Sequence, residues 1–328
     1  MRYLQRSIAT LALFAVASWL FANSPSRLDS LKNVLDQEAP YWTPEDLIPL
    51  FLDLGKAYID SGDPDNALNT LDQGINLSTA NKMFGLLQEL RLEKGRAYLK
   101  KDMVEDARVL FQECLTGSSQ EQSLSEAQAH QYLSEIFFLR GAFDDAYRHA
   151  IDNLLIREKR QDTLAMSAAL IQIGDIHFEQ DNFRLALRKY DSALDLQKGM
   201  SNEESLLPLY TALARVHKKL GRKDKALRYN KKALAIADKL KDRQGIAEGK
   251  ANNAELYIQL GLYEAAVQEY EDANLIFEDF DDRQGQVKSN TGIGKAYLLA
   301  GDPDQALYFL DEASCLAESS TEERQQLS

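Results

Sequence analysis

A short stretch occurs twice, near the two ends of this 328-residue chain, and this repetition constrains the fold more than any other feature. Residues 291–313 contain Gly-Lys-Ala-Tyr, Gly-Asp-Pro-Asp and Ala-Leu, and the same groups occur in the same order from residue 55. The copies are 239 residues apart, one residue short of six steps of forty. A period sustained over such a distance is typical of an array of stacked modules that pack on their neighbours instead of around one core.

Seven modules, numbered here in chain order, align on a small residue that recurs in steps of 40, 39, 40, 40, 40 and 40. The seven residues are Gly55, Gly95, Ser134, Gly174, Ala214, Ala254 and Gly294. An alanine follows each of them by twelve residues: Ala67, Ala107, Ala146, Ala186, Ala226, Ala266 and Ala306. Small residues at fixed positions let two helices approach closely, so each module is predicted to be an antiparallel helix pair.

Between the small residue and the alanine, each module has a ring and then a turn. Three residues after the small residue stand Tyr58, Tyr98, Phe137, His177, His217, Tyr257 and Tyr297. Seven residues after it stand Gly62, Asp102, Gly141, Asp181, Gly221, Gly261 and Gly301, which suit the left-handed backbone that ends a helix. Asp-Pro at 63–64 and at 302–303 is then expected to start the second helix, as N-cap and first residue.

This pattern resembles the tetratricopeptide repeat. The family's small, aromatic and alanine positions fall on Gly294, Tyr297, Ala306, Leu310 and Ala313, with Leu310 in place of the second ring. The resemblance covers residues 43–317 and implies an all-α, right-handed superhelical solenoid of seven helix pairs with an N-terminal capping helix. The forty-residue period exceeds the usual period of about 34. The resemblance carries no catalytic residue, and no catalytic, cofactor or metal site is predicted.

The N-terminus differs from the rest of the chain. Arg2 and Arg6 precede the uncharged stretch 8–22, which is shorter than the roughly 20 residues that a membrane span needs. It suits a secretory signal with an Ala-Val-Ala cleavage site at 15–17, and an uncleaved anchor or a buried helix are the alternatives. The expected organisation is a signal or anchor (1–22), a linker and capping helix (23–42), the array (43–317) and a flexible tail (318–328).

Charge is distributed unevenly. The net charge of −13 disfavours nucleic-acid binding, because phosphates repel an acidic surface. Residues 211–243 nevertheless hold twelve basic and three acidic residues, a net charge of +9 that leaves −22 for the rest of the chain. This basic module could receive an acidic partner or lipid head groups, or it could be neutralised internally by the acidic stretch 261–285.

The resemblance also implies where a partner binds, because ligands of such proteins usually lie along the concave face lined by the first helices. On this chain the implied partner-binding residues are Phe138, Phe178, Arg215, Lys218, Lys219, Asn252 and Lys288. They would form a groove with an apolar half and a basic half, suited to an acidic, amphipathic segment of a protein or peptide. The outer basic residues Arg228, Lys231 and Lys232 are the second candidate surface.

The predicted function is therefore a non-enzymatic, exported interaction scaffold without a cofactor, located in the periplasm or secreted. Contact with a membrane is expected only through the N-terminal segment, if that segment is not cleaved. The alternative is the sensor input module of a signalling system, of histidine-kinase or cyclase type, whose output element lies elsewhere. An enzyme is a third possibility, and it would require a cluster of perturbed titratable groups in a deep pocket.

Overall fold

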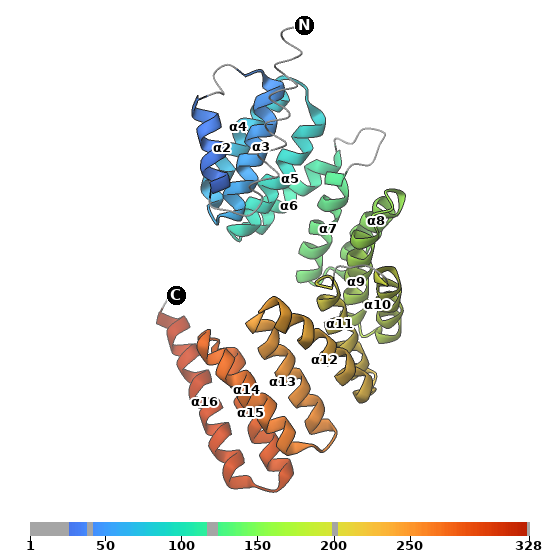
Figure 1. Ribbon diagram of the computed structural model, residues 1–328, viewed down its shortest axis with the longest axis vertical. Helices are drawn as coiled ribbons and strands as arrows, with labels where there is room; N and C mark the ends of the chain where they lie inside the picture. Colours follow the sequence, from blue (N-terminus) through green and yellow to red (C-terminus); the bar gives the residue numbers. More distant parts are fainter. Residues whose placement is uncertain (1–25, 38–41, 117–123, 199–202, 327–328) are drawn as a thin grey trace. The chain divides into compact units, whose positions relative to one another are not determined.

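The structure, a computed structural model, describes residues 26–37, 42–116, 124–198 and 203–326. Over these residues the chain forms fifteen α-helices and no strand, which confirms the predicted all-α class (Figure 1). The predicted signal or anchor at residues 8–22 lies outside the described residues. Among the described helices, none is both long enough and apolar enough to span a bilayer.

Within the described residues, the helix α2 is followed by seven helix pairs. The first helix of each module is called the A helix below, and the second the B helix. The bounds are α2 (Ser26–Gln37), then α3 (Pro44–Asp60) with α4 (Pro64–Ala80), α5 (Phe84–Lys100) with α6 (Val104–Thr116), α7 (Leu124–Leu139) with α8 (Phe143–Lys159), α9 (Thr163–Glu179) with α10 (Phe183–Gln197), α11 (Leu206–Lys219) with α12 (Lys223–Leu240), α13 (Arg243–Gln259) with α14 (Tyr263–Asp279), and α15 (Arg283–Ala300) with α16 (Pro303–Gln326).

The helices group into two compact units, residues 1–160 and 161–328, which are described separately. Unit 1 contains α2 to α8, and α2 packs on α3, as expected of a capping helix. Unit 2 contains α9 to α16. The last helix continues to Gln326, so helical structure extends through most of the segment predicted as a tail from residue 318.

The repeat alanines lie at the contacts between helices. Six of the seven alanines that define the modules are completely buried, and Ala306 is 2% exposed. The residue opposite the small position is complementary in size. A Cβ atom placed on Gly174 would lie 2.3 Å from Tyr190 Cε1, and one on Gly95 would lie 2.4 Å from Phe111 Cε1. These distances are far inside van der Waals contact, so a larger residue at either glycine requires the ring or the helix to shift.

Two modules that depart from the pattern are compensated locally. In module three, Ser134 replaces the glycine and its hydroxyl donates to the carbonyl oxygen of Ala146 at 2.8 Å, while Ala150 replaces the second ring. In module five, Asn230 replaces that ring, and its amide donates to the carbonyl oxygen of Gly249 and to Asn253 Oδ1, both at 2.7 Å. A buried amide needs such partners, and they fix α12 against α13.

The turn between the two helices of each module is left-handed throughout. All seven predicted turn residues have positive φ, between 58° at Asp102 and 90° at Gly301. Five are glycines, which adopt this conformation without steric cost, and two are aspartates. The turn prediction is therefore confirmed for every module.

Helix starts also follow the sequence. Thr43 donates from its backbone N and from Oγ1 to the Asp46 carboxylate, and Pro44 is the first residue of α3. Asp63 accepts from the backbone N of Asn66 at 3.2 Å, as an N-cap does. The sequence Asp-Arg-Gln-Gly occurs at residues 242–245 and 282–285, where α13 and α15 begin. In both copies the aspartate accepts a hydrogen bond from the backbone N of the glycine three residues later.

Candidate partner-binding surface

The predicted partner-binding residues lie on A helices. Phe138 lies on α7 in unit 1, and the other predicted residues lie in unit 2. Within unit 2, Phe178 is on α9, Asn252 on α13 and Lys288 on α15. The three predicted cations Arg215, Lys218 and Lys219 lie on α11, which contacts α9. Phe138, Phe178 and Lys218 share one module position, because they are forty residues apart, whereas the other four residues occupy different positions of their modules.

Arg215 is held by α9. Its guanidinium forms an ion pair with the Asp175 carboxylate, and its Nη1 lies 3.9 Å from Glu179 Oε1. The guanidinium carbon also lies 4.2 Å from the ring centroid of Phe178, a cation–π contact. Phe178 is only 7% exposed beneath it. The predicted apolar anchor is therefore covered, and a partner reaches this ring only after Arg215 has moved.

Asp175 connects Arg215 to the module interior. Its Oδ1 also accepts a hydrogen bond from the hydroxyl of Tyr190, at 2.8 Å. Burial raises the pKa of Asp175, and the positive charge of Arg215 acts against this rise. Burial and the neighbouring Asp175 also raise the pKa of Tyr190, which is fully buried. Each polar group of this cluster has a partner in the cluster, so the arrangement joins α9, α10 and α11.

The second predicted cation is also neutralised from a neighbouring helix. Lys218 forms an ion pair with Glu255 of α13. Lys219 is exposed, and its ammonium nitrogen lies 5.9 Å from the ring centroid of Phe183. Lys288 is exposed and Asn252 is half-buried. The A-helix face of unit 2 thus carries less uncompensated positive charge than the sequence predicts, because Asp175 and Glu255 neutralise its two central cations.

The outer face of α12 is different. Six basic and two acidic residues occur on this helix, and Arg228, Lys231 and Lys232 are exposed. No ion pair involves these three cations within the part of the chain that the structure describes. Together with Asp224, Leu227 and Ala235 they line an open hollow of about 470 Å³. This is the second surface that the sequence indicates, and here the positive charge stays unneutralised.

The acidic stretch 261–285 neutralises only a small part of the basic module. Asp279 forms an ion pair with Arg243, whereas Glu269 and Asp272 pair with Lys250 of α13. Outside this stretch, Glu203 pairs with Lys239 at the end of α12. Within the described residues, the cations that pair with the acidic stretch are therefore not Arg228, Lys231 or Lys232. The internal-neutralisation alternative does not account for the charge of the outer α12 face.

One cluster of titratable groups was not singled out from the sequence. His130 of α7 and His149 of α8 lie with Nδ1 atoms 2.8 Å apart, and Asp152 lies beside them. The sequence could have indicated this cluster through the positions of the three residues in the module, because an antiparallel helix pair brings these positions together. His177 and His217, in contrast, occupy the ring position of their modules. His217 is 4% exposed and stacks on Tyr229, so it belongs to the module core.

Comparison with protein families confirms the nature of the repeats. A family model described as tetratricopeptide repeat matches residues 165–239, and a second model of the same description matches residues 48–81 and 249–279. These matches cover modules in both units and agree with the observed helix pairs. The chain is a tetratricopeptide repeat protein.

Solved structures of tetratricopeptide repeat proteins and related helical proteins share this fold. The apo form of RapI superposes with a TM-score of 0.67 at 15% identity, covering 83% of this chain and 77% of RapI. A Rap protein complexed with Competence and Sporulation Factor gives a TM-score of 0.59 at 18% identity, covering 84% of this chain and 77% of that protein. At these identities the likeness establishes the fold alone.

A curated relative of this tetratricopeptide repeat protein is the mouse (Mus musculus) Tonsoku-like protein. The two sequences are 33% identical over 91 residues, which is 28% of this chain. The matched region spans 7% of the mouse protein, so the similarity concerns the repeats and not the whole of that protein.

Proposed function

We propose that this tetratricopeptide repeat protein is a non-enzymatic interaction scaffold, and that unit 2 binds an acidic, amphipathic segment of a partner protein. The repeats support a scaffold, because an array of helix pairs presents long helical faces on which a segment can lie. The neighbouring Rap structure is of a protein complexed with a factor, which supports the same class of function by analogy of fold.

One observation carries this proposal. Unit 2 presents cations on two faces, and acidic side chains pair with the two central cations of the A-helix face but with none of the three cations on the outer face of α12. Arg215 and Lys218 of the A-helix face have acidic partners on neighbouring helices. Arg228, Lys231 and Lys232 are exposed on α12 and pair with no acid that the structure describes. An acidic segment gains more from the α12 face, because there it replaces water instead of an existing ion pair.

The α12 face also offers apolar contact. Leu227 and Ala235 line the same hollow as the three cations, one on each side of them in sequence. A segment that alternates acids with aliphatic residues could bury its apolar side chains there while its acids meet the rim. Buried anchors then provide most of the affinity, and the charges increase the association rate.

The scaffold is proposed to be exported. This part of the proposal is supported by the sequence, in which two arginines precede an uncharged stretch at residues 8–22. The contact of such a protein with a membrane would be through this segment, if it is retained.

A photo-crosslinking experiment separates the two faces. A benzophenone amino acid is placed at Ala235 on α12 or at Thr291 on α15, both of which are exposed. The full-length protein is irradiated in extract of its native host, and adducts are identified by mass spectrometry. We expect a specific adduct from position 235, absent when Arg228, Lys231 and Lys232 are all changed to glutamate, and weakened by added salt.

The matched control is the pair Lys219→Glu and Lys288→Glu, which changes the charge of the A-helix face and leaves α12 intact. This variant should keep the adduct at position 235. Adducts formed only from position 291, and lost in this control variant, would show that the A-helix face is the binding site. An adduct at position 235 that persists after charge reversal and at high salt would contradict the acidic nature of the partner.

A further inference from the structure

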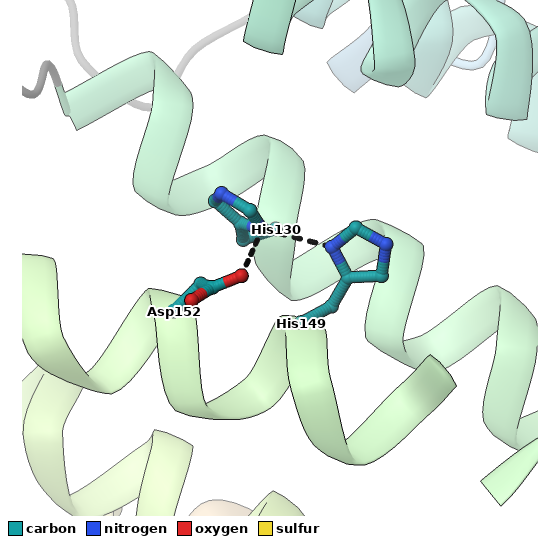
Figure 2. A group of neighbouring side chains, drawn as sticks. All are labelled: His130, His149 and Asp152. Carbon is teal, nitrogen blue, oxygen red and sulfur yellow. Dashed lines mark hydrogen bonds and ion pairs between the residues drawn. The ribbon is translucent and has the colours of Figure 1, made fainter. Parts of the chain in front are cut away.

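Three potential metal ligands meet between the two helices of module three. His130 projects from α7 toward His149 and Asp152 of α8 (Figure 2). The two Nδ1 atoms are 2.8 Å apart, and Asp152 Oδ2 lies 3.8 Å from His130 Nδ1. One ligand atom from each residue lies within 4.8 Å of the other two. Two imidazole nitrogens and a carboxylate oxygen are a donor set that Zn²⁺ accepts.

The repeat register, and not a chance side-chain placement, brings these three residues together. The positions 120 residues later, in module six, are Lys250, Glu269 and Asp272. There the lysine Nζ lies 2.7 Å from Asp272 Oδ2 and 3.4 Å from Glu269 Oε2. The same three module positions thus form a cluster in which a cationic side chain from the A helix lies between two acids from the B helix.

Other modules fill these positions with a cation as well. In module five, 80 residues after the histidines, the set is Tyr210, Tyr229 and Lys232, and the lysine Nζ lies 5.0 and 5.6 Å from the two ring centroids. In module two, two of the three positions are Arg91 and Glu113, whose side chains lie 3.3 Å apart. In modules two, five and six a lysine or arginine therefore supplies the positive charge, whereas modules one and seven have no cation at these positions.

Module three has no lysine or arginine at these positions. From the ligand geometry, and from the contrast with modules two, five and six, we infer that His130, His149 and Asp152 bind a Zn²⁺ ion, which takes the place of the cationic side chain of those three modules. Ligand atoms about 2.0–2.1 Å from a tetrahedral ion are about 3.3 Å apart. The two measured separations of 2.8 and 3.8 Å lie on either side of this value. The third separation, between His149 and Asp152, is within 4.8 Å, so rotation of the side chains would bring the three ligand atoms to this spacing, and water would complete the fourth position.

The surroundings favour a bound cation. His149 is 9% exposed, and its ring stacks on Phe137 with a centroid distance of 5.5 Å and an interplanar angle of 3°, which holds its orientation. Glu126 lies one turn before His130 on α7 and adds negative charge. The nearby Arg148 is engaged by Asp145, 2.6 Å away. The proton now shared by the two Nδ1 atoms would move to Nε2 when both bind the metal.

Binding would join α7 to α8 in a module in which Ala150 replaces the buried second ring. Ser134 and Ala150 occupy the positions where module four has Gly174 and Tyr190, so module three lacks the buried ring. The site is therefore structural, and its expected effect is on the stability of unit 1.

The test uses the full-length, tag-free protein, freed of metal with a chelator. Zinc content after equilibration with ZnCl₂ is measured by elemental analysis, affinity by calorimetry, and ligand geometry by the visible absorption of Co²⁺. We expect one Zn²⁺ per chain, a tetrahedral Co²⁺ spectrum and a higher melting temperature with zinc. The matched control His177→Gln removes a histidine of unit 2 and should leave zinc binding unchanged.

The decisive variant replaces the cluster with that of module six, as His130→Lys with His149→Glu. Its side chains reproduce the observed Lys250, Glu269 and Asp272 arrangement, so it should fold, lose zinc binding by at least about tenfold, and melt independently of zinc. Asp152→Asn, at a half-exposed position, provides a second variant and should weaken binding without unfolding. No zinc uptake by the parent protein, or equal uptake by all variants, would overturn the inference.

Discussion

At the scale of single residues, polar groups inside this protein are matched to specific neighbours. Asn230 replaces a ring and bridges two helices, and Asp175 joins Arg215 to Tyr190. His217 differs from these residues, because it is a titratable group that packs as a ring. It takes a ring position of the module, stacks on Tyr229 with a centroid distance of 5.5 Å, and is 4% exposed. A protonated imidazole at this place would be a buried charge among cations.

This environment makes stability depend on pH. Burial, together with the positive charges of Lys225, Arg222 and Arg228, lowers the pKa of His217 to about 4. In the unfolded chain the group takes up a proton below about pH 6.5, whereas in the folded chain it does so only near pH 4. The contribution of neutral His217 to the free energy of unfolding is therefore complete above pH 6.5, and it is lost as the pH falls from about 6.5 to about 4.

We expect His217→Phe to reduce the loss of stability between pH 7 and pH 5 by about 2 kcal/mol, because phenylalanine keeps the ring contact and cannot be protonated. Phe137 occupies the same position in module three, so the substitution fits the repeat. Urea unfolding of both proteins at the two pH values measures the difference. An unchanged pH dependence in the variant would show that His217 does not bind its proton in this way.

At the scale of elements, the helix pair is stabilised by close approach at small residues. Ala186 and Ala226 are completely buried on α10 and α12. Where a glycine occupies the A helix, as at Gly174, the facing side chain is large and lies where a Cβ would be. In these pairs a small residue on one helix therefore packs against a large side chain on the other, and no free volume remains for an added methylene.

Ala186→Leu or Ala226→Leu should each destabilise the protein by about 1–3 kcal/mol, the usual cost of overpacking a helix contact. Lys231→Leu is the control, since Lys231 is exposed on α12 and its replacement adds apolar volume without a clash. Thermal unfolding followed by circular dichroism compares the three variants. Similar melting temperatures for all three would mean that the alanines are not at helix contacts.

At the scale of the whole molecule, an acidic chain contains one strongly basic module. The net charge of −13 includes a contribution of +9 from residues 211–243. Under the proposed function, the basic region would attract acidic partners, with an effect that decreases as salt is added. The outer face of α12 displays this charge more openly than the A-helix face does.

The destination of the chain is a prediction at the same scale. If residues 8–22 direct export and are removed, protein isolated from the native host should begin near Ser18 or Asn23. N-terminal sequencing of the envelope and secreted fractions measures this directly. Soluble cytoplasmic protein with an intact Met1 would contradict export, and a membrane fraction with an intact N-terminus would indicate the anchor instead.

The sequence by itself determined the fold of this protein, because the information that specifies each module is local and is repeated seven times. The small residue, the left-handed turn and the buried alanine recur at fixed spacings, so one module explains the next. These features predict helices, their ends and their antiparallel pairing from steric and backbone requirements alone.

Only the tertiary structure decided which charges remain available and which side chains meet. Arg215 is neutralised by Asp175, forty residues earlier, and Lys218 by Glu255, thirty-seven residues later. His130 meets His149 and Asp152 across a helix pair. The sequence gives the number of such residues but not which of them are in contact, since ion pairs and metal ligands depend on distances of a few ångströms. Those distances are set by the packing of one helix on another.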